Sequence, residues 1–385
     1  MRVGLDRILI LSAEGEVFTV DPDGDNRVDL TNDAGPAFQH RQPVWSPTGE
    51  RIAWATFDAR DGSPKSAVVT SRPDGSDRTT ASTSAPPFFL YWDPTGTRVA
   101  YLAPGPVELE LGVVDVGAGG REATALAYGQ PSFFSWRPDG GALFSHIGAD
   151  ELSYITLDGA STRLAEDAGI FAAPEWSQAI GAVIYAARDG TGQTLVLAEP
   201  PPGGARRELL RFEGAMRFTL NPDGTRLAYV TTAIGGSAGD GLVITFRGAG
   251  PALPGLAVLD LATGASRPIS AGDVVAFIWN PGGDSLLYLL AEPRGGRPWL
   301  RWYVWDGHAS LGLGTFLPTA TFARDYLPFF DQYARALSLW SPDGLRFVYA
   351  GIDQEGVRGV WVQAADGAVP PILIADGEFA SWSPR

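Results

Sequence analysis

The amino-acid sequence predicts an all-β protein built as a single β-propeller of four-stranded antiparallel blades. The first supporting observation is a turn motif, Trp-Ser-Pro-Asp-Gly at 340–344, which recurs along the whole chain. The second is the spacing of its copies, because a period of roughly 40–50 residues made of short strands is typical of propeller blades. The third is the composition, with 48 Gly and 30 Pro in 385 residues, since short strands need many turns.

Each copy of the motif predicts a strand, a tight turn and a second strand. Pro342 presets φ for a turn position, and Gly344 accepts the positive φ that closes a short hairpin. The run Leu345–Ala350, rich in aromatic and β-branched residues, then favours a strand. Seven copies inside the chain and one at its end predict eight blades. The copies begin at Trp45, Trp92, Trp136, Trp176, Leu220, Trp279, Trp340 and Trp382.

Two further strands are expected after most of these turns. A Gly-rich insertion, 235–254, interrupts the fifth unit and contains a possible extra strand, Leu242–Phe246. In the sixth unit a long return through Thr321–Pro328 leads to a helical turn expected at Asp331–Ala336. The expected strands are Arg51–Thr56, Ser66–Ser71, Arg98–Ala103, Leu109–Val116, Ala142–Ile147, Leu152–Leu157, Ala182–Ala187, Thr194–Ala198, Arg226–Thr231, Leu256–Leu261, Ser285–Leu290, Trp299–Trp305, Arg346–Ala350 and Val357–Gln363.

The two ends of the chain predict closure of the ring. Residues 1–31 hold three expected strands, Arg7–Ser12, Glu16–Val20 and Arg27–Thr31, but no tryptophan-bearing inner strand. Glu378–Pro384 supplies such a strand with no partner after it. We therefore expect residues 1–31 and 378–385 to share one blade of a single domain spanning 1–385. Closure of this kind removes exposed sheet edges.

The Trp-Ser-Pro-Asp-Gly hairpins resemble the repeats of TolB-like β-propellers, which also occur in the propeller domains of prolyl-oligopeptidase-type peptidases. Val17–Gly24 and Arg27–Thr31 match the third and fourth strands of such repeats. The resemblance implies an extracytoplasmic location, periplasmic or at the cell surface, with a cytoplasmic location as the alternative. Two departures stand out: TolB carries an α/β domain before a six-bladed propeller, and the peptidases carry a hydrolase domain.

Composition excludes several classes of site and partner. The chain has no cysteine, so disulfides and thiolate metal sites are excluded. A formal net charge of −15 argues against nucleic acid or an anionic membrane as the main partner. No apolar run reaches transmembrane length, so no membrane insertion is expected. No cofactor motif is present.

No metal site is predicted, because the candidate ligands do not gather along the chain. The three histidines, His40, His146 and His308, belong to different blades. The carboxylates of Asp21–Asp25 resemble a calcium loop. Asp and Gly are also the residues that hairpin turns need, so a turn is the favoured interpretation.

Two segments are candidates for a binding surface at one mouth of the central channel. In a propeller, the segments that precede inner strands lie at that mouth, and two of them combine polar and aromatic side chains. Packing between blades is the alternative for the aromatic residues. The predicted partner-binding residues are His40, Arg41, Tyr326, Phe330, Asp331, Gln332 and Tyr333.

The sequence favours a non-catalytic scaffold that binds a protein or peptide partner through this mouth, as the extracytoplasmic part of a larger envelope protein. No Gly-x-Ser-x-Gly elbow or Walker loop is present, so no catalytic residue is assigned. The alternative is an enzyme: a hydrolase or lyase that acts on polysaccharide or peptide in the channel, or the propeller of a peptidase whose catalytic domain is absent. Convergence of His40 with carboxylates in the channel would favour that alternative.

Overall fold

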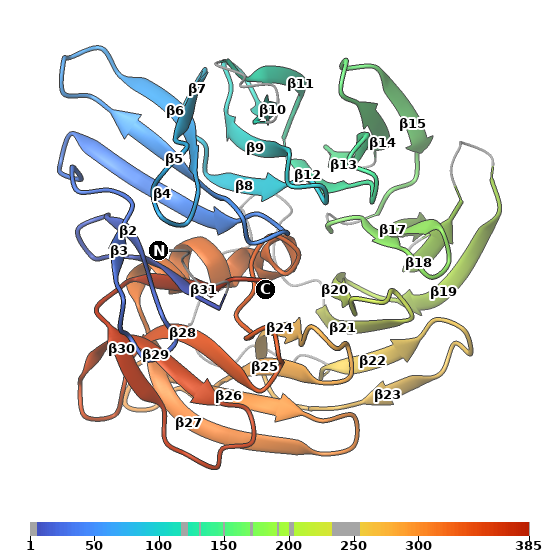
Figure 1. Ribbon diagram of the computed structural model, residues 1–385. Helices are drawn as coiled ribbons and strands as arrows, with labels where there is room; N and C mark the ends of the chain where they lie inside the picture. Colours follow the sequence, from blue (N-terminus) through green and yellow to red (C-terminus); the bar gives the residue numbers. More distant parts are fainter. Residues whose placement is uncertain are drawn as a thin grey trace.

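The computed structural model describes residues 6–116, 122–130, 132–148, 151–169, 172–190, 192–199, 204–232 and 255–384. In these residues the strands form antiparallel sheets arranged around a ring (Figure 1). Six sheets have four strands, and one has seven because the end of β27 (Ser310–Pro318) pairs with β28 (Arg346–Ile352). The seven-stranded sheet joins two neighbouring blades, so the described part of the chain forms the eight blades that the sequence predicts.

We number the blades from the one that holds the first described strand. The order within each blade runs from the channel outward. Blade 1 consists of β31 (Phe379–Trp382), β1 (Ile8–Leu11), β2 (Val17–Val20) and β3 (Val28–Asp29), and blade 2 of β4 (Phe38–Trp45), β5 (Ile52–Asp58), β6 (Lys65–Ser71) and β7 (Thr79–Thr83). Blade 3 consists of β8 (Phe89–Trp92), β9 (Arg98–Pro104), β10 (Leu109–Asp115) and β11 (Thr124–Gly129). Blade 4 consists of β12 (Ser132–Trp136), β13 (Ala142–Ile147), β14 (Glu151–Thr156) and β15 (Ser161–Ala165).

Blades 5 to 7 repeat this order, and blade 8 has an inner strand reduced to a single bridge between Trp340 and Phe347. Blade 5 consists of β16 (Glu175–Ser177), β17 (Ala182–Asp189), β18 (Gly192–Ala198) and β19 (Arg206–Phe212), and blade 6 of β20 (Ala215–Leu220), β21 (Arg226–Thr232), β22 (Ala257–Asp260) and β23 (Ser266–Pro268). Blade 7 consists of β24 (Val274–Trp279), β25 (Leu286–Ala291), β26 (Leu300–Trp305) and β27. Blade 8 adds β28, β29 (Arg358–Ala364) and β30 (Ile372–Ala375) to its inner bridge.

The two ends of the chain close the ring, as the sequence predicts. β31 is the inner strand of blade 1 and pairs antiparallel with β1, with Trp382 opposite Ile8 and Phe379 opposite Leu11. The backbones of Arg7 and Ser383 extend this pairing by one further hydrogen bond, from the Ser383 N–H to the Arg7 carbonyl at 2.8 Å. The inner edge of β1 is therefore covered by the other end of the chain.

At four blade junctions the repeated tryptophan joins a blade to the one before it. Its indole N–H donates a hydrogen bond to the carbonyl that directly precedes the corresponding tryptophan, or Leu220, of the preceding blade. Because both groups are at fixed positions in the repeat, the same bond type recurs at these four junctions. The bonds are Trp92 to Val44 (3.3 Å), Trp136 to Tyr91 (3.0 Å), Trp279 to Thr219 (3.1 Å) and Trp340 to Ile278 (3.2 Å). Elsewhere, Trp45 Nε1 is buried without a partner among the described residues, and Trp382 Nε1 donates to Asp6.

The residue after the tryptophan holds the turn. In blade 3, Asp93 Oδ1 accepts the backbone N–H groups of Thr97 and Arg98 at 2.8 and 2.7 Å. Asn280 in blade 7 and Ser341 in blade 8 accept equivalent backbone bonds, at 3.0 Å from Ser285 and 2.9 Å from Arg346. The turn glycines have positive φ as predicted, for example 70° at Gly344.

Three local expectations can be compared with the structure. Asp21–Asp25 forms a hairpin turn, in which the Asp21 N–H bonds to the Asp25 carbonyl at 2.9 Å and Arg7 pairs with Asp21 at 2.6 Å. The expected strand Trp299–Trp305 packs against the next blade, with Trp302 edge-on to Phe347 of blade 8 at 5.5 Å. The expected insertion 235–254, with the strand Leu242–Phe246, lies outside the described residues. No helix in the described ranges has the length and apolar character needed to span a bilayer.

We expect Trp92→Phe to lower the free energy of unfolding by about 2–4 kcal/mol, because it leaves the Val44 carbonyl without its donor and shrinks a buried side chain. Trp92 is 1% exposed. The matched control is Trp299→Phe, at a half-buried tryptophan, with an expected change of about 0.5 kcal/mol or less. Urea unfolding monitored by circular dichroism measures both. Equal stability of the two variants would show that the inter-blade bond contributes nothing.

Candidate binding site in the central channel

One segment of the chain lies inside the ring, and we call residues 319–337 the channel segment. It follows β27, the outer strand of blade 7, and leads to the inner bridge of blade 8. It forms a π-helical turn η1 (Phe322–Tyr326), a 3-10 turn η2 (Leu327–Phe329) and a short helix α1 (Phe330–Tyr333). Figure 1 shows it as the orange helical ribbon surrounded by the blades. The helical turn expected at Asp331–Ala336 is therefore part of a longer helical segment.

Aromatic contacts join the channel segment to inner strands on different sides of the ring. Tyr326 stacks on Phe379 of blade 1, with ring centroids 3.6 Å apart. Tyr333 lies edge-on to Phe89 of blade 3 at 5.0 Å. Phe330 contacts Phe277 of blade 7 at 4.7 Å, again edge-on. An apolar channel lining thus receives an apolar segment, which removes both surfaces from water.

Polar contacts fix the segment at further points. The Tyr333 hydroxyl donates to Gln42 Oε1 at 2.9 Å and to the Phe88 carbonyl at 3.3 Å. Arg217 of blade 6 donates to the Pro328 carbonyl at 2.6 Å and lies 3.5 Å from Asp331. Burial raises the pKa of Asp331, although the nearby Arg217 opposes that shift.

These contacts differ from the predicted binding surface at the channel mouth, because they bury most of its residues. Of the predicted residues in this segment, Tyr326, Phe330, Asp331 and Tyr333 are buried, and Gln332 is half-buried. The physical reason is that their aromatic rings contact the channel wall rather than solvent. The sequence placed the segment correctly at the channel, but it did not indicate that the segment enters and fills that end.

The other two predicted residues lie apart from the channel segment. His40 is 2% exposed within β4, where its ring contacts Phe38 at 4.8 Å and Nε2 lies 2.9 Å from Asp33 Oδ1. Arg41 is exposed and donates to the Gln39 side chain. The structure therefore does not bring His40 and Arg41 together with the channel segment into one exposed surface.

The opposite end of the channel contains a cavity of about 240 Å³. Its wall comes from the ends of inner strands in blades 1, 2, 3, 6 and 7 and from the last residues of the channel segment. Exposed turn prolines lie at the rim, and tryptophans and Tyr91 lie further in. The lining includes Pro47, Tyr91, Pro281, Ala334, Arg335 and Pro384.

Arg335 is the charged side chain among the described residues that line this cavity. Its guanidinium donates from Nε and Nη2 to Glu175 Oε2, at 2.9 and 2.6 Å, and its side chain is 30% exposed. The Glu175 side chain is 3% exposed. Burial raises the pKa of Glu175, and the charge of Arg335 opposes that shift. The pair places one oriented cation beside an otherwise apolar and aromatic wall.

Sequence reasoning missed Glu175, although a signal was present. Glu175 directly precedes Trp176, and the equivalent position is neutral in the other copies, for example Val44, Tyr91 and Ile278. A single carboxylate at a position that faces a buried blade junction indicates a charged partner elsewhere. That partner, Arg335, follows 160 residues later, and only the closed ring brings the two together.

No family model matches the chain, and no curated protein matches it in sequence. Solved structures do match it. The dihydro-heme d1 dehydrogenase NirN aligns with a TM-score of 0.60 and 15% identity, over 100% of this chain and 77% of that one. The β-propeller domain of the Trilobed protease from Pyrococcus furiosus, which has an open velcro topology, aligns with a TM-score of 0.53 and 12% identity, over 84% and 94%.

TolB from Acinetobacter baumannii aligns with a TM-score of 0.43 and 15% identity, over 80% of this chain. The chain matches 62% of the length of that TolB, which is less than two thirds. The alignment with the Trilobed protease domain, at low identity, supports the β-propeller fold that the sheets show.

We expect Arg335→Met to lower the free energy of unfolding at pH 7 by about 3–5 kcal/mol, because it leaves the Glu175 carboxylate buried without its partner. The control is Arg324→Met, since the Arg324 side chain is 75% exposed and, among the described residues, pairs only with its neighbour Asp325. Urea unfolding at several pH values measures both.

The deficit of Arg335→Met should depend on pH in one direction. Without Arg335, the folded-state pKa of Glu175 rises further above its unfolded value of about 4.3. The penalty is therefore absent below about pH 4 and grows as pH rises from the unfolded pKa to the folded pKa. A deficit that is constant between pH 4.5 and 7.5 would contradict the assignment of Glu175 as the uncompensated charge.

Proposed function

We propose that this propeller is a non-catalytic binding module that takes up a peptide segment of a partner protein in the cavity at the open end of its channel. The observation that carries this proposal is the asymmetry of the channel. The channel segment fills one end with buried aromatic contacts, whereas the other end keeps a cavity of about 240 Å³. A partner therefore has a concave site at that one end.

The size of the cavity favours a short segment. A volume of about 240 Å³ equals that of roughly eight water molecules, and it is smaller than the ~300–1,000 Å³ of typical drug-sized pockets. It suits one or two side chains inserted from a peptide, while the rest of that peptide lies across the rim. Rim prolines such as Pro47, Pro281 and Pro384 are exposed and offer rigid apolar contacts.

The chemistry of the wall favours an apolar or aromatic side chain next to an acidic group. Tyr91 provides an aromatic face, and Arg335 provides an oriented cation. The blades hold these groups in fixed relative positions, so little conformational entropy is lost when a ligand binds. Aromatic side chains and Arg are also the residue types that dominate binding energy at interfaces.

The same residues support a role without catalysis. In the described lining of the cavity, Arg335 and Tyr91 are the titratable side chains. Burial raises the pKa of Tyr91 to about 12, so it is protonated near neutral pH, and Arg335 is already paired with Glu175. Neither is suited to act as a general base at neutral pH. A hydrolase or lyase, the alternative from the sequence, would need carboxylates or histidines converging there.

The proposal includes an extracytoplasmic location, with the propeller as the exported part of a larger envelope protein. Its support is the resemblance of the Trp-Ser-Pro-Asp-Gly hairpins to TolB-like repeats.

Selection of peptides from a random displayed library on the immobilised protein tests the proposed function. We expect selected peptides to carry an aromatic or aliphatic residue near an acidic group. Ala334→Phe should fill the cavity and weaken their binding at least tenfold, measured by fluorescence anisotropy. The matched control is Ala368→Phe, at an exposed turn outside the cavity lining, which should leave binding unchanged.

The outcome that would refute this site is a set of peptides whose affinity is equal in Ala334→Phe and in the wild type, with circular dichroism confirming that both are folded. Recovery of no peptide above background from repeated selections would refute peptide binding itself.

A further inference from the structure

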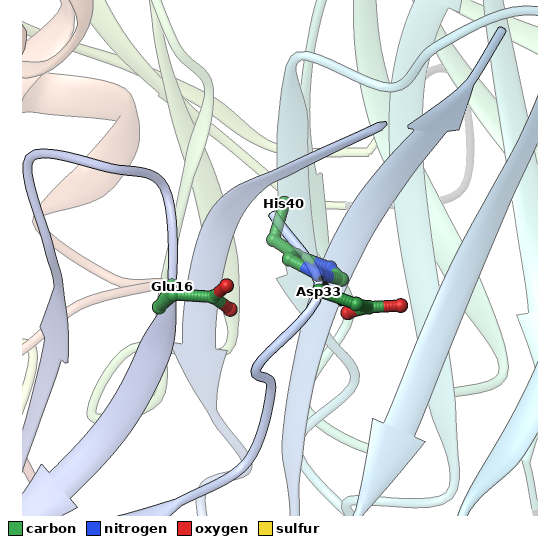
Figure 2. Close-up of side chains that lie close together, drawn as sticks. All are labelled: Glu16, Asp33 and His40. Carbon is green, nitrogen blue, oxygen red and sulfur yellow. Dashed lines mark hydrogen bonds and ion pairs between the residues drawn. The ribbon is translucent and has the colours of Figure 1, made fainter. Parts of the chain in front are cut away.

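Three side chains from different positions in the repeat lie close together between blades 1 and 2. Glu16 lies between β1 and β2, Asp33 lies in the connection from β3 to β4, and His40 lies in β4. One ligand atom from each falls within 4.8 Å of the other two. Figure 2 shows the His40 ring with the two carboxylates on either side of it. None of the three lines the channel cavity, so the cluster is separate from the proposed peptide site.

The imidazole of His40 is the central group of this cluster. Its Nε2 lies 2.9 Å from Asp33 Oδ1, and a carboxylate can only accept, so Nε2 carries the proton. Nδ1 is buried and has no hydrogen-bond partner in the described part of the chain. An ion held between Glu16, Asp33 and His40 would therefore bind Nε2 and displace its proton, because Nε2 is the ring nitrogen that faces Asp33.

The Glu16 carboxylate is held in place by its own partners. Oε1 accepts the backbone N–H of Ala34 at 2.6 Å, and Oε2 accepts the Thr31 hydroxyl. Each oxygen keeps a second lone pair for a ligand. Hydrogen bonds of this kind orient metal ligands in known sites.

Positive groups near the cluster are few and are engaged elsewhere. Arg60 Nη1 lies 4.0 Å from Asp33 Oδ2, but the same guanidinium bonds Asp58 at 2.8 Å and lies over the Phe38 ring at 4.0 Å. Arg78, which also faces His40, lies over the Trp54 ring and donates to the Leu30 carbonyl. Two carboxylates beside a neutral imidazole therefore leave a local excess of negative charge.

We propose that Glu16, Asp33 and His40 form a binding site for one divalent transition-metal ion of the Zn²⁺ type. One imidazole nitrogen and two carboxylates are ligands that Zn²⁺ accepts, whereas Ca²⁺ and Mg²⁺ prefer oxygen alone. Asp33 is exposed and Glu16 is half-buried, so water can reach the site and complete the coordination. The ion would connect blade 1 to blade 2 at the point where the chain passes from one to the other.

Isothermal titration calorimetry of the full chain with ZnCl₂ tests this proposal, using protein without a histidine tag that has been stripped with a chelator. We expect one Zn²⁺ per chain. Asp33→Asn should weaken the affinity at least tenfold, and because Asp33 is exposed this variant is expected to fold. Glu16→Gln is the second variant and should show the same loss.

The matched control is His308→Gln, an exposed histidine in a turn of blade 7, which should keep the wild-type affinity. Titration with CaCl₂ should give a much weaker signal or none. Absence of Zn²⁺ binding to the wild type would overturn the proposal, and so would equal affinity in Asp33→Asn, Glu16→Gln and the wild type.

Discussion

The hydrogen bond from a tryptophan indole to the carbonyl of the preceding blade is the interaction on which the rest of this structure depends. It links the inner strands of blades 2 and 3, of blades 3 and 4, of blades 6 and 7, and of blades 7 and 8. Where Leu220 replaces the tryptophan of blade 6, the junction changes: the Leu220 N–H donates to Glu175 Oε2 at 3.1 Å. The junction between blades 5 and 6, where leucine replaces the tryptophan, thus contains a buried carboxylate, which in turn binds Arg335 at the cavity.

Closure of the ring explains why the channel has two different ends. Eight blades leave a channel that inner-strand side chains alone do not fill, and the channel segment occupies one end of it. That segment contacts inner-strand residues in blades 1, 2, 3, 5, 6 and 7, for example Phe379, Phe89 and Arg217. Its position therefore depends on every one of those blades being in place, and the cavity at the other end is what remains.

The sequence predicted the parts of this fold that rest on local chemistry. The turn prolines and glycines and the strand after Gly344 follow from residues close to one another in the sequence. The pairing of the two chain ends follows from the register of the repeat, because each end lacks the strands that the other supplies. The burial of Tyr333 and the pairing of Arg335 with Glu175 depend on segments that meet only when the ring closes. The cluster around His40 depends instead on how two consecutive blades pack, because Glu16 lies in the blade before it and Asp33 in the connection between the two. Such contacts leave little local signal, and an unusual residue at a repeated position, such as Glu175, is the main clue.

Hydrogen–deuterium exchange, resolved by peptide, tests most directly whether the ring is closed and filled at one end. The account predicts that β31 and the helical turns of 322–333 exchange as slowly as the inner strands β4 and β24, and more slowly than the outer strands β3 and β30. Rapid exchange in β31 would mean that the chain ends do not hold the ring together. Rapid exchange in 322–333 alone would mean that the channel is open at both ends. The difference between a filled end and an open end, on which the proposed binding site rests, would then be lost.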